Sequence, residues 1–103
     1  MVDERTIRSF VDAIRPRYED LLAQMVQVPS ISMDPSRAGD MRRMAELAAN
    51  CLTELGADVT IVETEGYPLV SGGWTSGAQY PTVTVYNHLD VQPAQEPEWK
   101  REP

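Results

Sequence analysis

The sequence has 103 residues, of which 42% are hydrophobic and 24% charged, so it has the length and composition of one small globular domain. Sixteen acidic residues against nine basic ones leave a formal net charge of -7. This balance excludes a nucleic-acid partner, because affinity for phosphate backbones depends on clustered lysines and arginines.

The amino-terminal residues carry more acid than base, and no apolar stretch follows them, which is untypical of a secretory leader. No segment approaches the roughly 18 apolar residues that a membrane span requires. We therefore expect a cytoplasmic protein with no membrane partner.

A first helix is predicted over about Asp3 to Val28, where apolar residues recur at spacings of three and four. Pro16 lies inside this stretch and lacks a backbone donor, so we expect a kink or a restart of the helix there. Pro29 ends the helix, because the residue before a proline is pushed out of the helical region.

A second helix is predicted over about Ala38 to Leu55, with Gly56 placed where a left-handed cap is favoured. Cys51, the single cysteine, lies on the apolar stripe of this helix. One cysteine cannot form an intramolecular disulfide, and this position favours a small buried side chain over a nucleophile.

Three strand-like runs follow, and the third has the strongest β-propensity: Asp58–Thr64, Pro68–Trp74 and Thr82–His88. The tail Gln92–Pro103 is rich in proline and charge, and is predicted to be a loop. Helices followed by strands predict an α/β fold, with two helices packed on part of a mixed sheet.

The reactive side chains are concentrated at the end of the third run, in the triplet His88-Leu89-Asp90. Residues two apart on an extended chain point to the same face, so His88 and Asp90 are expected to project together from the carboxyl end of a buried strand. A neutral imidazole is a good zinc ligand, and a nearby carboxylate can fix its tautomer. The triplet alone leaves a second interpretation open, a hydrogen-bonded histidine at a strand end beside a turn aspartate.

The longer string around the triplet resembles the first metal motif of a dinuclear-zinc peptidase family, and its residues are Val85-Tyr86-Asn87-His88-Leu89-Asp90-Val91-Gln92-Pro93, with Trp99 downstream. That family includes carnosinase-type dipeptidases, aminoacylases, carboxypeptidase G and succinyl-diaminopimelate desuccinylases. The turn Val91–Pro93 and Trp99 are most similar to the dipeptidase branch. Upstream, Val28-Pro29-Ser30-Ile31-Ser32 resembles the exit from the family's first helix. Asn87 departs from the pattern, since glycine is commoner before the histidine.

The resemblance implies that His88 binds one of two zinc ions and that Asp90 supports it as an orienting carboxylate. It also implies that the remaining ligands and the general base lie beyond Pro103, so residues 1–103 are expected to be an incomplete amino-terminal part of the catalytic domain. The lid domain would be absent from this chain. We expect the complete protein to be a homodimer that hydrolyses peptides or acyl-amino acids, and the chain alone to be inactive.

Two other interpretations stay open at this point. The chain could be a non-catalytic, truncated or partner-binding α/β module, and a stop codon directly after Pro103 would favour that view. Alternatively, an unrelated α/β domain could contain the His-x-Asp triplet by chance.

Overall fold

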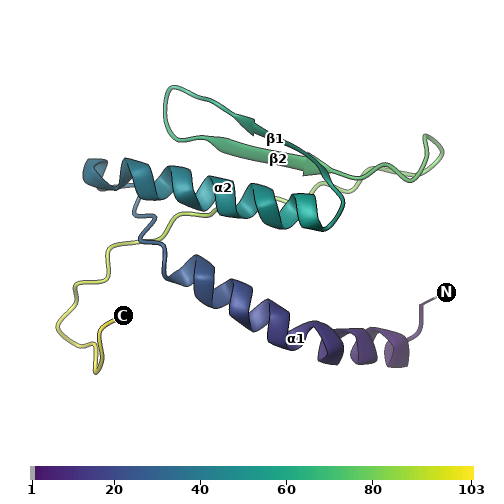
Figure 1. Cartoon of the computed structure of the whole chain (residues 1–103), viewed down its shortest axis with the longest axis horizontal. Coiled ribbons are helices and arrows are strands. Elements are labelled where there is room, and N and C mark those ends of the chain that lie inside the picture. Colours follow the sequence, from purple (N-terminus) through teal and green to yellow (C-terminus); the bar gives the residue numbers. More distant parts are fainter. Residues whose placement is uncertain (1) are drawn as a thin grey trace.

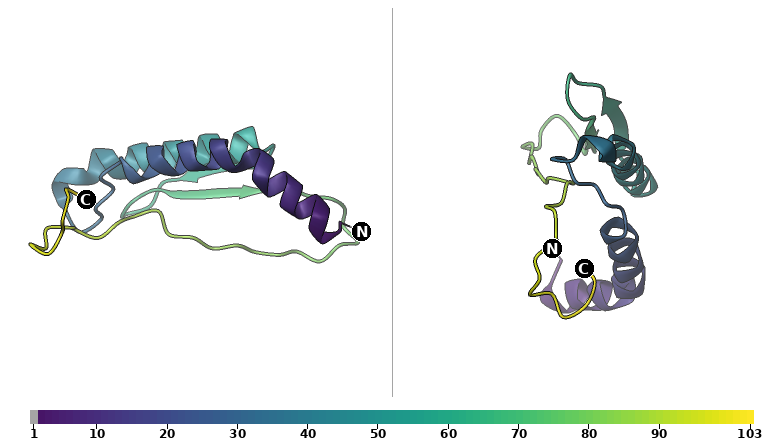
Figure 2. Two further views of the ribbon diagram at one scale, coloured as in Figure 1. Left: turned by 90° about the horizontal axis from the view of Figure 1, so that it is seen from below. Right: turned by 90° about the vertical axis from the view of Figure 1, so that its left-hand side faces the viewer.

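Helix α1 (Glu4–Val26) opens the chain in the computed structural model, which describes residues 2–103. Asp3 caps it, because its side chain accepts a hydrogen bond of 2.8 Å from the backbone N–H of Thr6. The helix continues through Pro16 without a break, and Figure 2 shows its axis bending along its length. The predicted kink is therefore confirmed, and the helix does not need to restart.

Most of the apolar stripe of α1 is not covered by other described parts of the chain, and only Leu21 and Met25 near its carboxyl-terminal end are partly buried. No residue of α1 is buried, and Phe10 and Tyr18 are 62% and 58% exposed. Figure 1 shows α1 on the side of α2 that faces away from the strands. An ion pair of 2.6 Å between Arg17 and Glu54 links the two helices at the surface.

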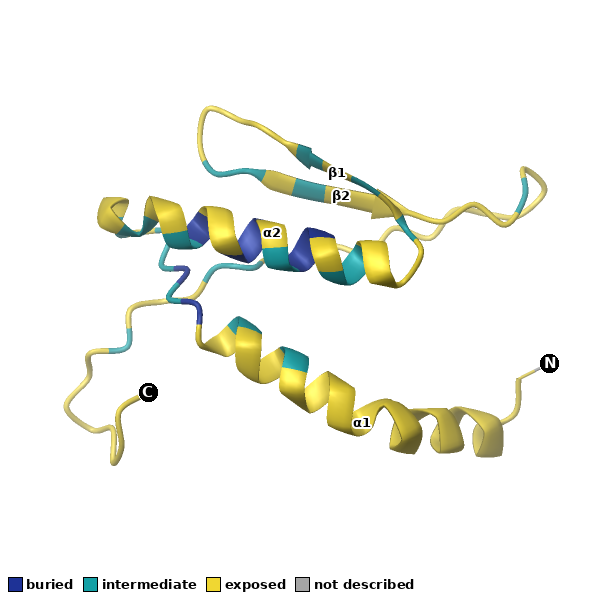
Figure 3. Cartoon of the chain, viewed as in Figure 1, coloured by how far each residue is buried: buried dark blue, intermediate teal, exposed yellow. Residues whose placement is uncertain are grey.

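Helix α2 (Ala38–Glu54) follows a short 3₁₀ helix, η1 (Pro35–Arg37), and supplies most of the buried apolar side chains. One face carries all of its buried residues, Met41, Met44, Ala45, Ala48 and Ala49 (Figure 3). Gly56 ends the helix with a positive φ of 84°, as predicted. The N–H groups of Gly56 and Ala57 bond to the carbonyls of Thr53 and Leu52, which satisfies two helix-end acceptors.

Strands β1 (Asp58–Val62) and β2 (Leu69–Gly73) form an antiparallel pair that covers one side of α2. Val59 pairs with Gly72, whose missing side chain leaves room for Leu52 of α2. The α/β class and the first two strands are thus confirmed, and the sheet of the described chain is two-stranded and antiparallel.

The third predicted strand, Thr82–His88, is wrong. This segment has no strand partner within residues 2–103, and Val83, Val85 and Tyr86 are 77–86% exposed. β-propensity describes how well a side chain suits a half-buried sheet surface, but a strand also requires a neighbour to receive its backbone hydrogen bonds. The predicted loop over Gln92–Pro103 is confirmed, since that tail contains no helix or strand. No described helix is long and apolar enough to cross a membrane.

Candidate metal-binding site

The turn that follows α1 lies against the His-x-Asp segment and fixes its backbone. Ile31 and Val91 form an isolated parallel bridge, in which the N–H of Val91 donates to the carbonyl of Ser30 at 2.9 Å. The hydroxyl of Ser30, which is fully buried, donates to the carbonyl of Leu89 at 3.2 Å. Two parts of the chain that are about 59 residues apart are thereby joined directly before and after Asp90.

Asp90 is held by a second serine from the same turn. The hydroxyl of Ser32 donates to Oδ2 of Asp90 at 2.6 Å, a short distance typical of a hydroxyl bonded to a carboxylate. This hydrogen bond is the main reason why the pKa of Asp90 lies below its ordinary value, with smaller contributions from its own backbone and from His88. Asp90 is therefore a carboxylate at neutral pH.

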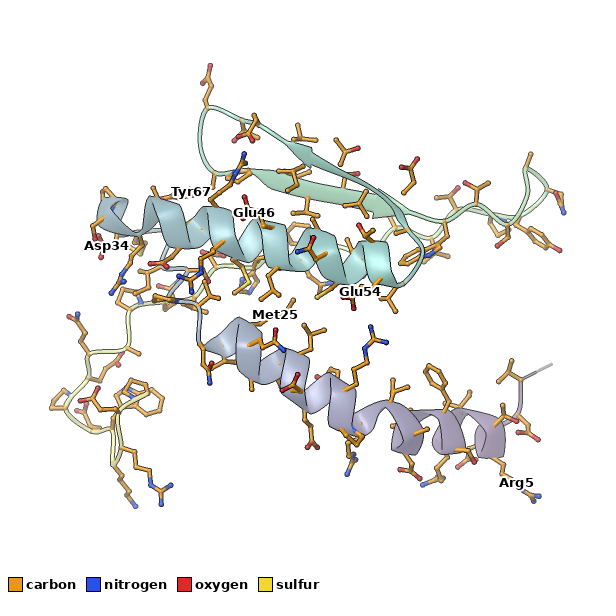
Figure 4. The ribbon with its side chains drawn as sticks, viewed as in Figure 1. Arg5, Met25, Asp34, Glu46, Glu54 and Tyr67 are labelled. Atoms are coloured by element: carbon orange, nitrogen blue, oxygen red, sulfur yellow. The ribbon has the colours of Figure 1, made fainter. Side chains whose placement is uncertain are left out.

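Tyr67 holds Ser32 from the other side. Its phenol donates to the carbonyl of Ser32 at 2.8 Å, and its side chain extends from the connection between β1 and β2 toward the amino-terminal end of α2 (Figure 4). The turn that carries both serines is thus fastened to the β-hairpin as well as to residues 89–91.

His88 contacts Asp90 through one ring nitrogen. Nδ1 lies 3.2 Å from Oδ1 of Asp90 and 3.1 Å from the carbonyl oxygen of the same residue. Both neighbours are acceptors, so the hydrogen of a neutral imidazole belongs on Nδ1, and the lone pair is on Nε2. The side chain of His88 is 74% exposed, whereas that of Asp90 is 32% exposed.

The structure therefore brings His88 and Asp90 together, as the sequence predicts. Their expected location at the end of a buried strand is wrong, because the segment before them is unpaired and exposed. Sequence reasoning also missed the part played by Ser30 and Ser32. The only signal in the sequence is the string Pro29-Ser30-Ile31-Ser32, which resembles a helix exit but does not indicate which residues the two serines contact.

The donors around His88 fit one position of a metal site. Nε2 is a suitable zinc ligand whose tautomer is set by a carboxylate on the opposite nitrogen, an arrangement common among zinc-binding histidines. Both oxygens of Asp90 are already hydrogen-bonded. Residues 2–103 contain no cluster of three or more His, Cys, Asp or Glu side chains that could hold an ion.

Two other features of the chain lie apart from this site. Cys51 is half-buried, and burial raises the pKa of its thiol, which agrees with the predicted structural role. Trp99, one of the residues that carry the resemblance, donates from its indole to Glu96 at 2.9 Å within the tail, whose residues also line two open concave surfaces.

Comparison with known proteins finds that the chain is similar to part of several metallodipeptidases and related dipeptidases. The chain is 30% identical over 104 residues to the Cys-Gly metallodipeptidase of Schizosaccharomyces pombe, and 28% identical over 107 residues to that of Saccharomyces cerevisiae. It is also 29% identical over 108 residues to the Beta-Ala-His dipeptidase of Rattus norvegicus. These matches cover 90–91% of this chain and 22% of each relative.

The resemblance to dipeptidase-family metallopeptidases is thereby confirmed. The chain spans about a fifth of the length of the curated relatives it matches. No family model matches the sequence, and no solved structure matches it significantly.

Proposed function

We propose that this chain is part of the catalytic domain of a metal-dependent dipeptidase or acyl-amide hydrolase, and that it supplies one metal ligand to the active site. One observation carries the proposal. In a chain related to metallodipeptidases, Ser32, Asp90 and His88 form a hydrogen-bonded series that ends in an imidazole nitrogen suited to a metal. The proposal includes zinc as the metal and a homodimer as the form of the complete protein.

In this proposal His88 would hold the metal through Nε2, and Asp90 orients the ring and increases its basicity through Nδ1. A bound metal pair would polarise the scissile carbonyl and lower the pKa of a water molecule. The remaining acidic ligands, the second histidine and the general base would come from outside residues 1–103. The names of the relatives suggest small dipeptides such as Cys-Gly or β-Ala-His as substrates.

The test requires a longer protein that contains this chain, assayed for dipeptide hydrolysis with and without a chelator and added zinc. We expect hydrolysis that the chelator abolishes and zinc restores. His88→Ala should lose both activity and bound metal. Measured without metal, its melting temperature should stay close to that of the unmutated protein, because the side chain is exposed. Ser36→Ala, a change in an exposed residue of η1, is the control and should keep both.

The competing interpretation, a non-catalytic module, predicts a different result. A folded longer protein that binds no metal and cleaves no dipeptide would support that interpretation. A well-folded His88→Ala protein with full metal occupancy would end the ligand assignment.

A further inference from the structure

Ser32 is joined to His88 of the metal motif through Asp90, which bonds to both residues. We infer that Ser32 is a positioning residue: its hydroxyl fixes the carboxylate of Asp90, and Asp90 in turn keeps the ring hydrogen of His88 on Nδ1. The benefit of this tautomer rests on the proposed function, since a hydrogen on Nδ1 leaves the lone pair of Nε2 available to a metal.

The two oxygens of Asp90 have separate partners. Oδ2 accepts the hydroxyl of Ser32 at 2.6 Å, and Oδ1 lies 3.2 Å from Nδ1 of His88. The shorter bond therefore sets the rotation of the carboxylate, and that rotation decides whether Oδ1 faces the imidazole. Without the hydroxyl, the carboxylate can turn toward solvent, because the side chain is 32% exposed.

Ser32 can act in this way because its own backbone is fastened on both sides. Its carbonyl accepts the phenol of Tyr67 at 2.8 Å, and Ile31, just before it, is bridged to Val91. Ser30 is completely buried, and its hydroxyl bonds to the carbonyl of Leu89 at 3.2 Å. The hydroxyl of Ser32 thus extends from a turn that the hairpin and residues 89–91 both hold.

The tautomer matters because a neutral imidazole has one donor nitrogen and one acceptor nitrogen. The partner of one nitrogen determines which nitrogen carries the hydrogen. His88 is 74% exposed, and Asp90 supplies both of its hydrogen-bond partners, through Nδ1. If the carboxylate turns away, the backbone carbonyl of Asp90 at 3.1 Å is the one remaining acceptor for Nδ1. The share of the alternative form, in which Nε2 carries the hydrogen and cannot bind a metal, therefore increases.

The test is nitrogen NMR of the imidazole in a longer, metal-free protein that contains this chain, in which the ring signals of His88 are identified by their loss in His88→Gln. Spectra are recorded in mildly alkaline solution, and the neutral ring is recognised by two ring-nitrogen signals with distinct chemical shifts. The chemical shifts of the two ring nitrogens then report the ratio of the two tautomers. The variants are Ser32→Ala, Ser32→Thr and Ser32→Val, of which the last has the shape of threonine without the hydroxyl. Ser36→Ala is the control, because the hydroxyl of Ser36 also bonds to an aspartate, Asp34.

We expect the Nδ1–H form to predominate in the unmutated chain. Ser32→Ala and Ser32→Val should lower the ratio of Nδ1–H to Nε2–H by roughly three- to tenfold, the worth of about one hydrogen bond. Ser32→Thr keeps a hydroxyl and should restore most of the ratio, and Ser36→Ala should leave it unchanged.

Two results would overturn the inference. One is an unmutated His88 with its hydrogen mainly on Nε2, whatever the variants do. The other is a Ser32→Val chain that matches Ser32→Thr in tautomer ratio. Neither measurement uses metal or substrate, so failure of the proposed hydrolase activity would appear separately, in the dipeptide assay.

Discussion

Gly72 offers a direct test of how the hairpin is seated on α2. A Cβ placed at Gly72 would lie 3.1 Å from Cδ1 of Leu52 and 3.4 Å from Cγ2 of Val59, whereas one at Gly73 would meet nothing within 4 Å. Neighbouring strand residues point to opposite faces, so the two glycines sample the packed and the open side of the same strand. We therefore compare Gly72→Val with Gly73→Val.

Both substitutions replace glycine by a residue that favours strands, a gain of up to about 1 kcal/mol at either position, so the comparison removes the backbone part of that gain. What remains is the cost of forcing a branched side chain into the contact with Leu52, about 1–3 kcal/mol for an overpacked site. The free energy of unfolding, measured by urea titration of the helical circular dichroism signal, should thus be lower for Gly72→Val by that amount. Equal stability of the two variants would show that α2 and the hairpin are not in close contact, and the packing described here would be wrong.

Further predictions concern the site, the isolated chain and its response to pH. In a longer, active protein, Asp90→Asn should lower metal affinity by about 10–100-fold without removing the ligand, as equilibrium metal competition would measure; an unchanged affinity would argue against the supporting role. The 103-residue chain alone should show no dipeptidase turnover and no tight zinc binding, since one histidine and one carboxylate cannot complete a site, and zinc-dependent cleavage by the purified chain would contradict this. The exposed stripe of α1 and the unpaired residues 82–86 should make the chain associate or melt at low temperature, so a sharp, concentration-independent melt of a monomer would count against that expectation. Hydrogen bonds from the backbone of Thr6 and from Ser36 lower the pKa values of Asp3 and Asp34 below the ordinary 3.8, so the stability they add is complete above that pH and is lost as the pH falls through the lowered values. The helical circular dichroism signal should therefore fall less on acidification in Asp3→Asn and in Asp34→Asn than in the unmutated chain. An identical fall in all three proteins would refute the capping roles.

The local elements could be predicted from the sequence because local rules determine them. The spacing of apolar residues predicts both helices, Gly56 predicts the end of α2, and two short strand-like runs predict β1 and β2, all within a few residues of the observed bounds. A bend in a helix that contains Pro16 also follows from the chemistry of one residue. Each of these features depends on interactions within the element or with its immediate neighbours.

The contacts of the candidate site could not be predicted in the same way. The bond between Ser32 and Asp90 joins residues 58 positions apart, and no periodic pattern connects them. The failed strand over Thr82–His88 has the same physical origin, since its propensity is local but its partner would have to come from elsewhere in the structure. A run of β-formers therefore indicates a segment that can pair, and does not establish that it does.

His88 and Asp90 lie side by side even though the predicted strand before them does not form, and there is a specific reason. Two side chains separated by one residue can lie on the same side of the chain whether or not a neighbouring strand is present. The ladder of a strand, by contrast, exists only when another backbone receives its hydrogen bonds. Here the motif is held from its carboxyl side, where Ser30 bonds to both Leu89 and Val91 and Ser32 bonds to Asp90. Pairing of Thr82–Tyr86 with another strand would add hydrogen bonds before His88 without requiring residues 89–91 to move. The arrangement that presents Nε2 of His88 therefore depends on the turn after α1, and it can form before the segment leading into it is paired.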